Sequence, residues 1–141
     1  MPQSATAHLP RFVISLEKEQ VADGKRTVEW RSDRPVRFFN VVAGKWAVHH
    51  GNGTAVYYHA AHHYNLEEIS DALDAARKYY SEWFCPYPWK ELKLSEFPNL
   101  STYAQGFPTD ITFSESIGFL TQSDAVSELA FLVAALSPIA F

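Results

Sequence analysis

Residues 65–84, with the sequence NLEEISDALDAARKYYSEWF, decide the fold of this chain because they carry its clearest periodic pattern. Apolar side chains recur there at spacings of three and four residues, which predicts one α-helix with a single buried stripe. The stripe consists of Leu66, Ile69, Leu73, Ala76, Tyr80 and Trp83. Asn65 is a favourable N-cap, and Glu68 stands where a capping-box partner belongs. The prolines at positions 86 and 88 end the predicted helix.

The first sixty residues contain short apolar runs separated by turn-forming residues, a pattern typical of strands. The predicted strands cover Arg11–Leu16, Thr27–Arg31, Val36–Val42, Lys45–His50 and Thr54–Tyr58. Asp23-Gly24 and Gly51-Asn52-Gly53 tolerate positive φ angles and therefore predict tight turns. We expect this region to form an antiparallel β meander.

Two further strands and a last helix are predicted after the long helix. Glu91–Phe97 and Ile111–Glu115 alternate apolar and polar side chains, as half-buried strands do. Ala125–Leu136 is apolar on nearly every side, which predicts a helix that must be buried. The expected fold is therefore α+β, with an antiparallel β meander, a long amphipathic helix, a small sheet and a buried C-terminal helix.

The composition is that of a soluble globular chain of 141 residues, with 47% apolar and 20% charged residues. A net charge of −4 gives no electrostatic reason to expect a nucleic acid or an anionic membrane as partner. The longest apolar stretch, Leu129–Leu136, is far shorter than the ~20 residues that span a bilayer. We expect neither a signal peptide nor a membrane span, and the sequence assigns no compartment.

His59 and His63 are the candidates for a metal-binding pair, because they have the spacing of the two histidines in an HExxH motif. Ala60 replaces the general-base glutamate of that motif, and Glu82 would be the third ligand. The predicted helix places Glu82 ~24 Å from His63, whereas Zn²⁺ ligands lie ~2.0–2.2 Å from the metal. We therefore predict no metal site here and interpret the segment as a polar connection.

Glu96 and Glu115 are candidates for a carboxylate pair, since both stand at ends of predicted strands. Two neighbouring carboxylates can divide acid and base roles between them. Glutamates are nevertheless mostly exposed in folded proteins. Solvent exposure is therefore the outcome that we expect for both.

A segment that begins in the last turns of the predicted helix resembles part of a known enzyme family. YYSEWFCPYPWKEL at residues 79–92 is similar to the first catalytic-domain helix, the F-G-x-Y-P turn and the next strand of zinc aminopeptidases of the membrane alanyl aminopeptidase family. Glu96-Phe97-Pro98 resembles the lead into that family's substrate-binding strand, and Ile111–Glu115 resembles the strand's far end. Phe38–Trp46 and Tyr79–Thr121 resemble bacterial members that are fused to transporter permeases.

The resemblance runs from about Val36 to Val133 and implies a domain organisation. Residues 1–60 would be the end of an N-terminal β domain, and residues 61–141 the front part of a thermolysin-like peptidase catalytic domain. The resembled family uses zinc, hydrolyses peptides and, in its permease-fused members, is associated with the membrane. A peptide is accordingly the partner that the resemblance implies.

The chain departs from the family at the exopeptidase motif G-x-M-E-N. The flanking segments place this motif on Tyr103, Ala104, Gln105, Gly106 and Phe107. The family's glutamate holds the free amino group of the substrate by a charge-assisted bond, and Gly106 has no carboxylate to do so. The resemblance thus implies a substrate-binding strand that lacks recognition of a free N-terminus.

A second departure concerns the zinc helix. Residues 131–135 resemble the lead into that helix, but Leu136, Ser137 and Ala140 stand where the two histidines and the catalytic glutamate of HExxH belong. Without a metal ion there is neither a polarised carbonyl nor an activated water. We expect a fragment or degenerate member of the family, truncated before the HExxH helix, inactive as this chain and without zinc. Uncovered apolar surface would then favour self-association or pairing with the missing catalytic half.

Two alternatives stay open. The first is a non-catalytic peptide-binding module that uses a strand over Leu100–Phe107, in which an extended peptide pairs with the strand backbone. The second is a zinc enzyme that uses His59, His63 and one further residue.

Overall fold

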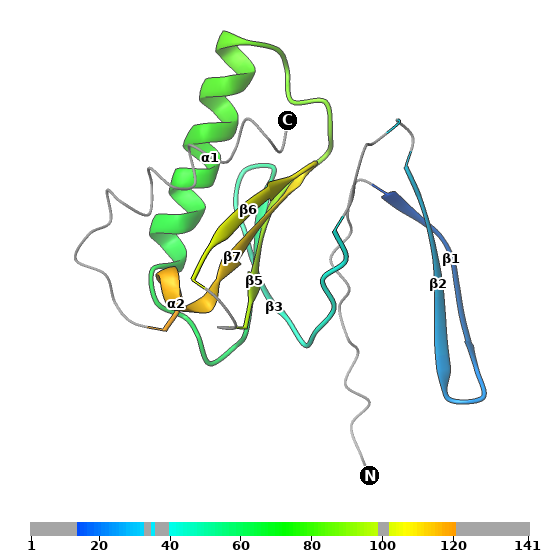
Figure 1. Ribbon diagram of the computed structural model, residues 1–141. Helices are drawn as coiled ribbons and strands as arrows, with labels where there is room; N and C mark the ends of the chain where they lie inside the picture. Colours follow the sequence, from blue (N-terminus) through cyan, green and yellow to red (C-terminus); the bar gives the residue numbers. More distant parts are fainter. Residues whose placement is uncertain (1–13, 33–34, 36–39, 99–101, 121–141) are drawn as a thin grey trace.

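The computed structural model of the chain describes residues 14–32, 35, 40–98 and 102–120 (Figure 1). These residues form a two-stranded hairpin, a five-stranded mixed sheet, one long helix and one short helix. The α+β class predicted from the sequence is therefore confirmed. The predicted helix over Ala125–Leu136, with Leu136, Ser137 and Ala140 at and beyond its end, lies outside the described residues.

The hairpin consists of β1 (Ile14–Ala22) and β2 (Lys25–Ser32), which pair antiparallel. Asp23 and Gly24 join them with φ angles of 51° and 71°, the combination that a type I′ turn requires. The predicted turn is thus confirmed. The described side chains of the hairpin are nearly all exposed, including Val21, so these side chains add little to the core.

The predicted strand over Val36–Val42 is wrong for the part that the structure describes. Residues 40–42 are not in a strand, and the Val41 side chain is 73% exposed. A strand needs a neighbour that satisfies its backbone N–H and C=O groups, and within the described residues none pairs with this segment. The meander is wrong for the same reason, because β2 and the next strand belong to different sheets.

The five-stranded sheet has the order β3-β4-β5-β7-β6. Its strands are β3 (Ala47–His50), β4 (Thr54–Tyr58), β5 (Leu92–Phe97), β6 (Ala104–Phe107) and β7 (Asp110–Ser114). The three central strands run parallel to one another, and the two outer strands pair antiparallel with their neighbours. The predicted domain division after residue 60 falls between strands of this one sheet.

The central position of β5 corrects the prediction of a half-buried strand. Lys93 is 2% exposed and Ser95 is fully buried, although both were expected on a solvent face. Parallel strands in the middle of a sheet are usually covered on both faces. The strand predicted over Ile111–Glu115 is corrected in the same way, because every residue of β7 is buried. Its last predicted residue, Glu115, is not in the strand and begins the short helix α2 (Glu115–Gly118).

The long helix α1 (Leu66–Trp83) connects the parallel strands β4 and β5, a connection that parallel pairing requires (Figure 1). Ile69, Leu73 and Ala76 are buried, and the first two join a core with the apolar side chains of the sheet. The core also contains Val56, Leu92, Leu94, Ile111, Phe113 and Phe119. The predicted stripe is wrong at Trp83, which is 71% exposed because the last turn of α1 extends past the core.

The capping box predicted for α1 does not form. Asn65 has a φ of 55°, in the left-handed region, and its side chain makes no cap hydrogen bond. Its amide Nδ2 instead donates to the backbone carbonyl of Gly118 at 2.7 Å. Asn65 therefore ties the start of α1 to α2, a long-range contact that competes with local capping.

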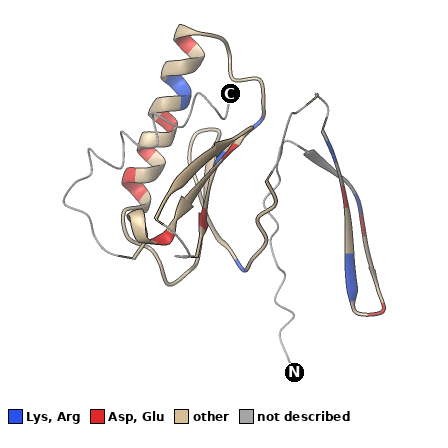
Figure 2. Cartoon of the chain, in the orientation of Figure 1, with Lys and Arg blue, Asp and Glu red and all other residues tan. Residues whose placement is uncertain are grey.

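Charged residues are distributed differently over the helix α1 and the hairpin of β1 and β2 (Figure 2). Acidic side chains are spaced along α1, where Glu67 and Glu68 in the first turn interact favourably with the helix dipole. The hairpin carries residues of both signs, including an ion pair of 2.8 Å between Arg26 and Glu19. Neither helix within the described ranges has the length and apolar character needed to cross a membrane.

Candidate functional site

The outer edge of β6 is one candidate site, because β6 is the last strand of the sheet. The N–H of Ser114 donates to the carbonyl of Tyr103 at 3.1 Å. Hydrogen-bonded and non-hydrogen-bonded pairs alternate along an antiparallel ladder. The backbone N–H and C=O groups of Ala104 and Gly106 therefore point away from β7. Among residues 40–98 and 102–120, no strand pairs with that side of β6.

The five residues predicted to bind substrate alternate between the two faces of the sheet. Ala104 packs against the core, and Gly106 is buried. Tyr103 and Gln105 are exposed on the opposite face of the sheet, and Phe107, on that same face, is half-buried. The strand predicted over Leu100–Phe107 is shorter than expected, since residues 102 and 103 precede β6 and residues 100 and 101 lie outside the described ranges.

The open edge is partly closed by a residue of β6 itself. Nε2 of the Gln105 side chain donates to the carbonyl of Gly106 at 3.2 Å. This local bond satisfies an acceptor that would otherwise face outward. A peptide that paired with β6 would replace it with a backbone hydrogen bond, so Gln105 competes with any added strand.

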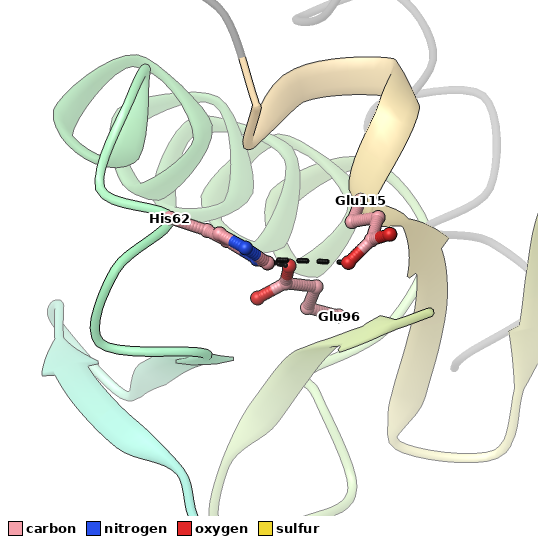
Figure 3. Close-up of side chains that lie close together, drawn as sticks. All are labelled: His62, Glu96 and Glu115. Carbon is pink, nitrogen blue, oxygen red and sulfur yellow. Dashed lines mark hydrogen bonds and ion pairs between the residues drawn. The ribbon is translucent and has the colours of Figure 1, made fainter. Parts of the chain in front are cut away.

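A second candidate site lies where the three parallel strands end. β4, β5 and β7 run in the same direction, so their carboxyl ends meet at one end of the sheet. The loop after β4 supplies His62, β5 supplies Glu96, and the residue after β7 is Glu115. Figure 3 shows the three side chains pointing toward one another. Ligand sites in sheets with parallel strands are usually found at this end.

The His62 ring lies close to both carboxylates. Nδ1 of His62 lies 2.5 Å from Oε1 of Glu96 and 3.6 Å from Oε2 of Glu115 (Figure 3). The expectation of exposure is wrong for Glu96, whose side chain is 2% exposed, and Glu115 is also largely covered. Glu96 is buried because β5 is covered on both faces, including the one that carries Leu92 and Leu94.

His59 and His63, the candidate metal-binding pair of the sequence, do not belong to this group of three. The backbone N–H of His59 donates to Oε2 of Glu96 at 2.6 Å, and the His59 ring is 4.8 Å from that of His62. The ring of His63 stacks on Tyr64. Glu82 is exposed in the last turns of α1, a helix ~27 Å long that begins close to His63.

Sequence reasoning missed His62 and did not place Glu96 and Glu115 next to the same histidine. The available signal was the position of His59, Glu96 and Glu115 at or next to the ends of three predicted strands. That signal becomes informative only when the strands are known to be parallel, because antiparallel strands deliver such residues to opposite ends of a sheet.

Comparison of the amino-acid sequence with protein-family models and with curated proteins finds no match.

Proposed function

We propose that this chain binds an extended peptide along β6 and is a non-hydrolysing relative of the aminopeptidases that it resembles. The observation that supports this most directly is the outer edge of β6, where the N–H and C=O groups of Ala104 and Gly106 face away from β7. Addition of a peptide strand to such an edge is a common mode of recognition, in which the backbone provides affinity.

Specificity would come from the side chains next to the added strand. Tyr103 is half-exposed and its ring contacts that of Phe97 at 4.8 Å. The exposed part of the Tyr103 ring offers an apolar surface to a side chain of the peptide. Gly106 stands where the resembled family has a glutamate, so we do not expect this chain to select peptides by a free amino group.

We do not expect peptide hydrolysis by this chain, since its sequence contains no HExxH motif. A purified sample should give no turnover of an aminoacyl anilide. Turnover that a chelator removes and zinc restores would contradict this part of the proposal.

The binding experiment follows the fluorescence anisotropy of a labelled extended peptide as the 141-residue chain is added. The informative variant is Ala104→Pro, because proline is tolerated on edge strands and removes only an outward N–H. We expect affinity to fall roughly three- to tenfold, since one net hydrogen bond contributes ~0.5–1.5 kcal/mol. The matched control is Gln105→Ala, which frees the Gly106 carbonyl and should leave affinity unchanged or higher.

A second control modifies the peptide. Methylation of alternate backbone nitrogens blocks the hydrogen bonds of an added strand while the side chains stay the same. Such a peptide should not bind. The proposal fails if the unmodified peptide shows no saturable binding, or if Ala104→Pro and the methylated peptide bind as well as their parents.

A further inference from the structure

We propose that His62, Glu96 and Glu115 form a binding site for a divalent transition-metal ion, with Zn²⁺ the best match. One ligand atom from each residue lies within 4.8 Å of the other two. The inference is independent of peptide binding at β6, and it uses none of the positions that correspond to the HExxH motif of the resembled family.

The donor set identifies the class of ion. One imidazole nitrogen with two carboxylate oxygens is borderline between soft and hard ligands, and such mixed sets suit Zn²⁺ and its neighbours better than Mg²⁺ or Ca²⁺, which prefer oxygen alone. Three protein ligands also leave at least one coordination position for water. In the deprotonated form that binds a metal, two carboxylates and one imidazole carry a charge of −2, which a divalent cation would neutralise.

Two of the three distances between ligand atoms fit an ion after a small adjustment. Ligand atoms on a tetrahedral zinc lie about 3.4 Å apart when each is ~2.1 Å from the metal. The 3.6 Å between Nδ1 of His62 and Oε2 of Glu115 is close to that value. The 2.5 Å between Nδ1 of His62 and Oε1 of Glu96 is a hydrogen-bond contact, shorter than the spacing of ligand atoms around an ion. Binding of an ion would displace the proton of that hydrogen bond and separate the two atoms by about 1 Å.

The surroundings hold the ligands in place. The His59 N–H binds Oε2 of Glu96 and leaves Oε1 facing His62. The His62 N–H in turn donates to the carbonyl of His59 at 2.7 Å, which fixes the turn that carries the imidazole. Such supporting hydrogen bonds orient metal ligands in known sites. His59 is therefore a positioning residue for the proposed ion rather than a ligand.

Burial of Glu96 supports the same conclusion. Its carboxylate is 2% exposed, and a carboxylate removed from water needs a compensating charge or hydrogen bonds. The His59 N–H and the His62 ring supply these in the absence of an ion. A bound cation would supply a stronger compensation at the same place.

The test is isothermal titration calorimetry of the chelator-treated, dialysed 141-residue chain with ZnCl₂. We expect one saturable site. Glu115→Gln and His62→Gln should each weaken Zn²⁺ binding at least about tenfold, since even the loss of a supporting residue typically costs 10–100-fold. These two side chains are partly exposed, so their variants keep the fold better than a change at buried Glu96 would.

The matched control is His63→Gln, which removes a neighbouring exposed imidazole that stacks on Tyr64 and should leave Zn²⁺ affinity unchanged. Circular dichroism of each variant without metal confirms that it is folded. A parallel titration with MgCl₂ should give much weaker binding. The inference is overturned if the chain has no saturable Zn²⁺ site, if His63→Gln loses the site, or if folded Glu115→Gln and His62→Gln bind as the parent does.

Discussion

The hydroxyl of Ser95 donates to Oδ1 of Asp110 at 2.8 Å, in the interior between β5 and the start of β7. Asp110 is fully buried, and its pKa is raised to about 7 by that burial. The Ser95 hydrogen bond, the charge of Lys93 and a hydrogen bond from Asn40 each oppose the rise. Tyr87, whose own pKa is raised by burial, lies close enough to feel the Asp110 charge. Among the residues that the structure describes, Asp110 is therefore the carboxyl group through which we expect pH to affect folding most.

The free energy of unfolding should fall as pH rises from about 4 to about 7 through this group. The folded state holds the Asp110 proton more tightly than the unfolded state does. The stabilisation that this proton gives is therefore fully present below the pKa of Asp110 in the unfolded chain, and it is lost as pH rises through the higher pKa of the folded state. The change attributable to Asp110 is on the order of 4 kcal/mol. Urea unfolding of the parent and of Asp110→Asn at several pH values separates the contribution of Asp110 from that of all other titrating groups.

Asp110→Asn should flatten the pH profile, and Ser95→Ala should shift the sensitive range to higher pH because a bond that favours the charged form is removed. Parallel profiles for the parent and Asp110→Asn would show that Asp110 does not control stability in this range.

Two substitutions in α1 test which part of the predicted stripe belongs to the core. Leu73 is fully buried, so Leu73→Ala should lower the free energy of unfolding by about 2–5 kcal/mol. Trp83 is largely exposed, so Trp83→Ala should change it by less than about 1 kcal/mol. Chemical denaturation of both variants makes the comparison, and a larger loss for Trp83→Ala would place that ring in the core.

Asn65 combines a left-handed backbone with a long-range hydrogen bond, and two variants separate these contributions. Asn65→Ala loses the bond to the Gly118 carbonyl and places alanine at a φ of 55°. Asn65→Gly loses the same bond without the backbone strain. We expect Asn65→Gly to be more stable than Asn65→Ala by about 1 kcal/mol. Equal thermal stability would mean that the left-handed conformation imposes no strain.

Asp74 connects α1 to the turn between β3 and β4. Its carboxylate accepts hydrogen bonds from the Asn52 N–H at 2.9 Å and from the hydroxyl of buried Thr54. Asp74→Ala should lower the free energy of unfolding by about 1–3 kcal/mol, because the hydroxyl of buried Thr54 loses its acceptor. The control is Asp71→Ala, an exposed acidic residue of the same helix, which should have an effect within about 0.5 kcal/mol. Similar losses of unfolding free energy for the two variants would argue against a stabilising connection between Asp74 and the turn.

Elements with strong local signals were predictable from the sequence. The stretch from Leu66 to Trp83 forms one helix, and Thr54–Tyr58 forms a strand with the predicted bounds. Asp23-Gly24 makes the expected turn. In each case the pattern depends on neighbours within a few residues, such as helical periodicity or tolerance of positive φ, and it persists whatever the rest of the chain does.

The candidate sites were predictable only in part. The five residues of the expected substrate strand include all of β6, and it was the resemblance, not a local pattern, that pointed to them. The acidic pair Glu96 and Glu115 was noticed, but its burial and its contact with His62 were not predictable. These depend on whether β4, β5 and β7 run parallel, and pairing direction has no periodic signature in a single strand.

The amino-acid sequence by itself determined the α+β class, the long helix and the individual hairpin turns, because these follow from interactions between residues close along the chain. Only the tertiary structure decided that the three central strands are parallel, that β5 is buried on both faces, and that Asn65 binds Gly118 rather than capping its helix. Each of these depends on contacts between residues far apart in sequence. The free energy of such contacts comes from burial and pairing that no local pattern encodes.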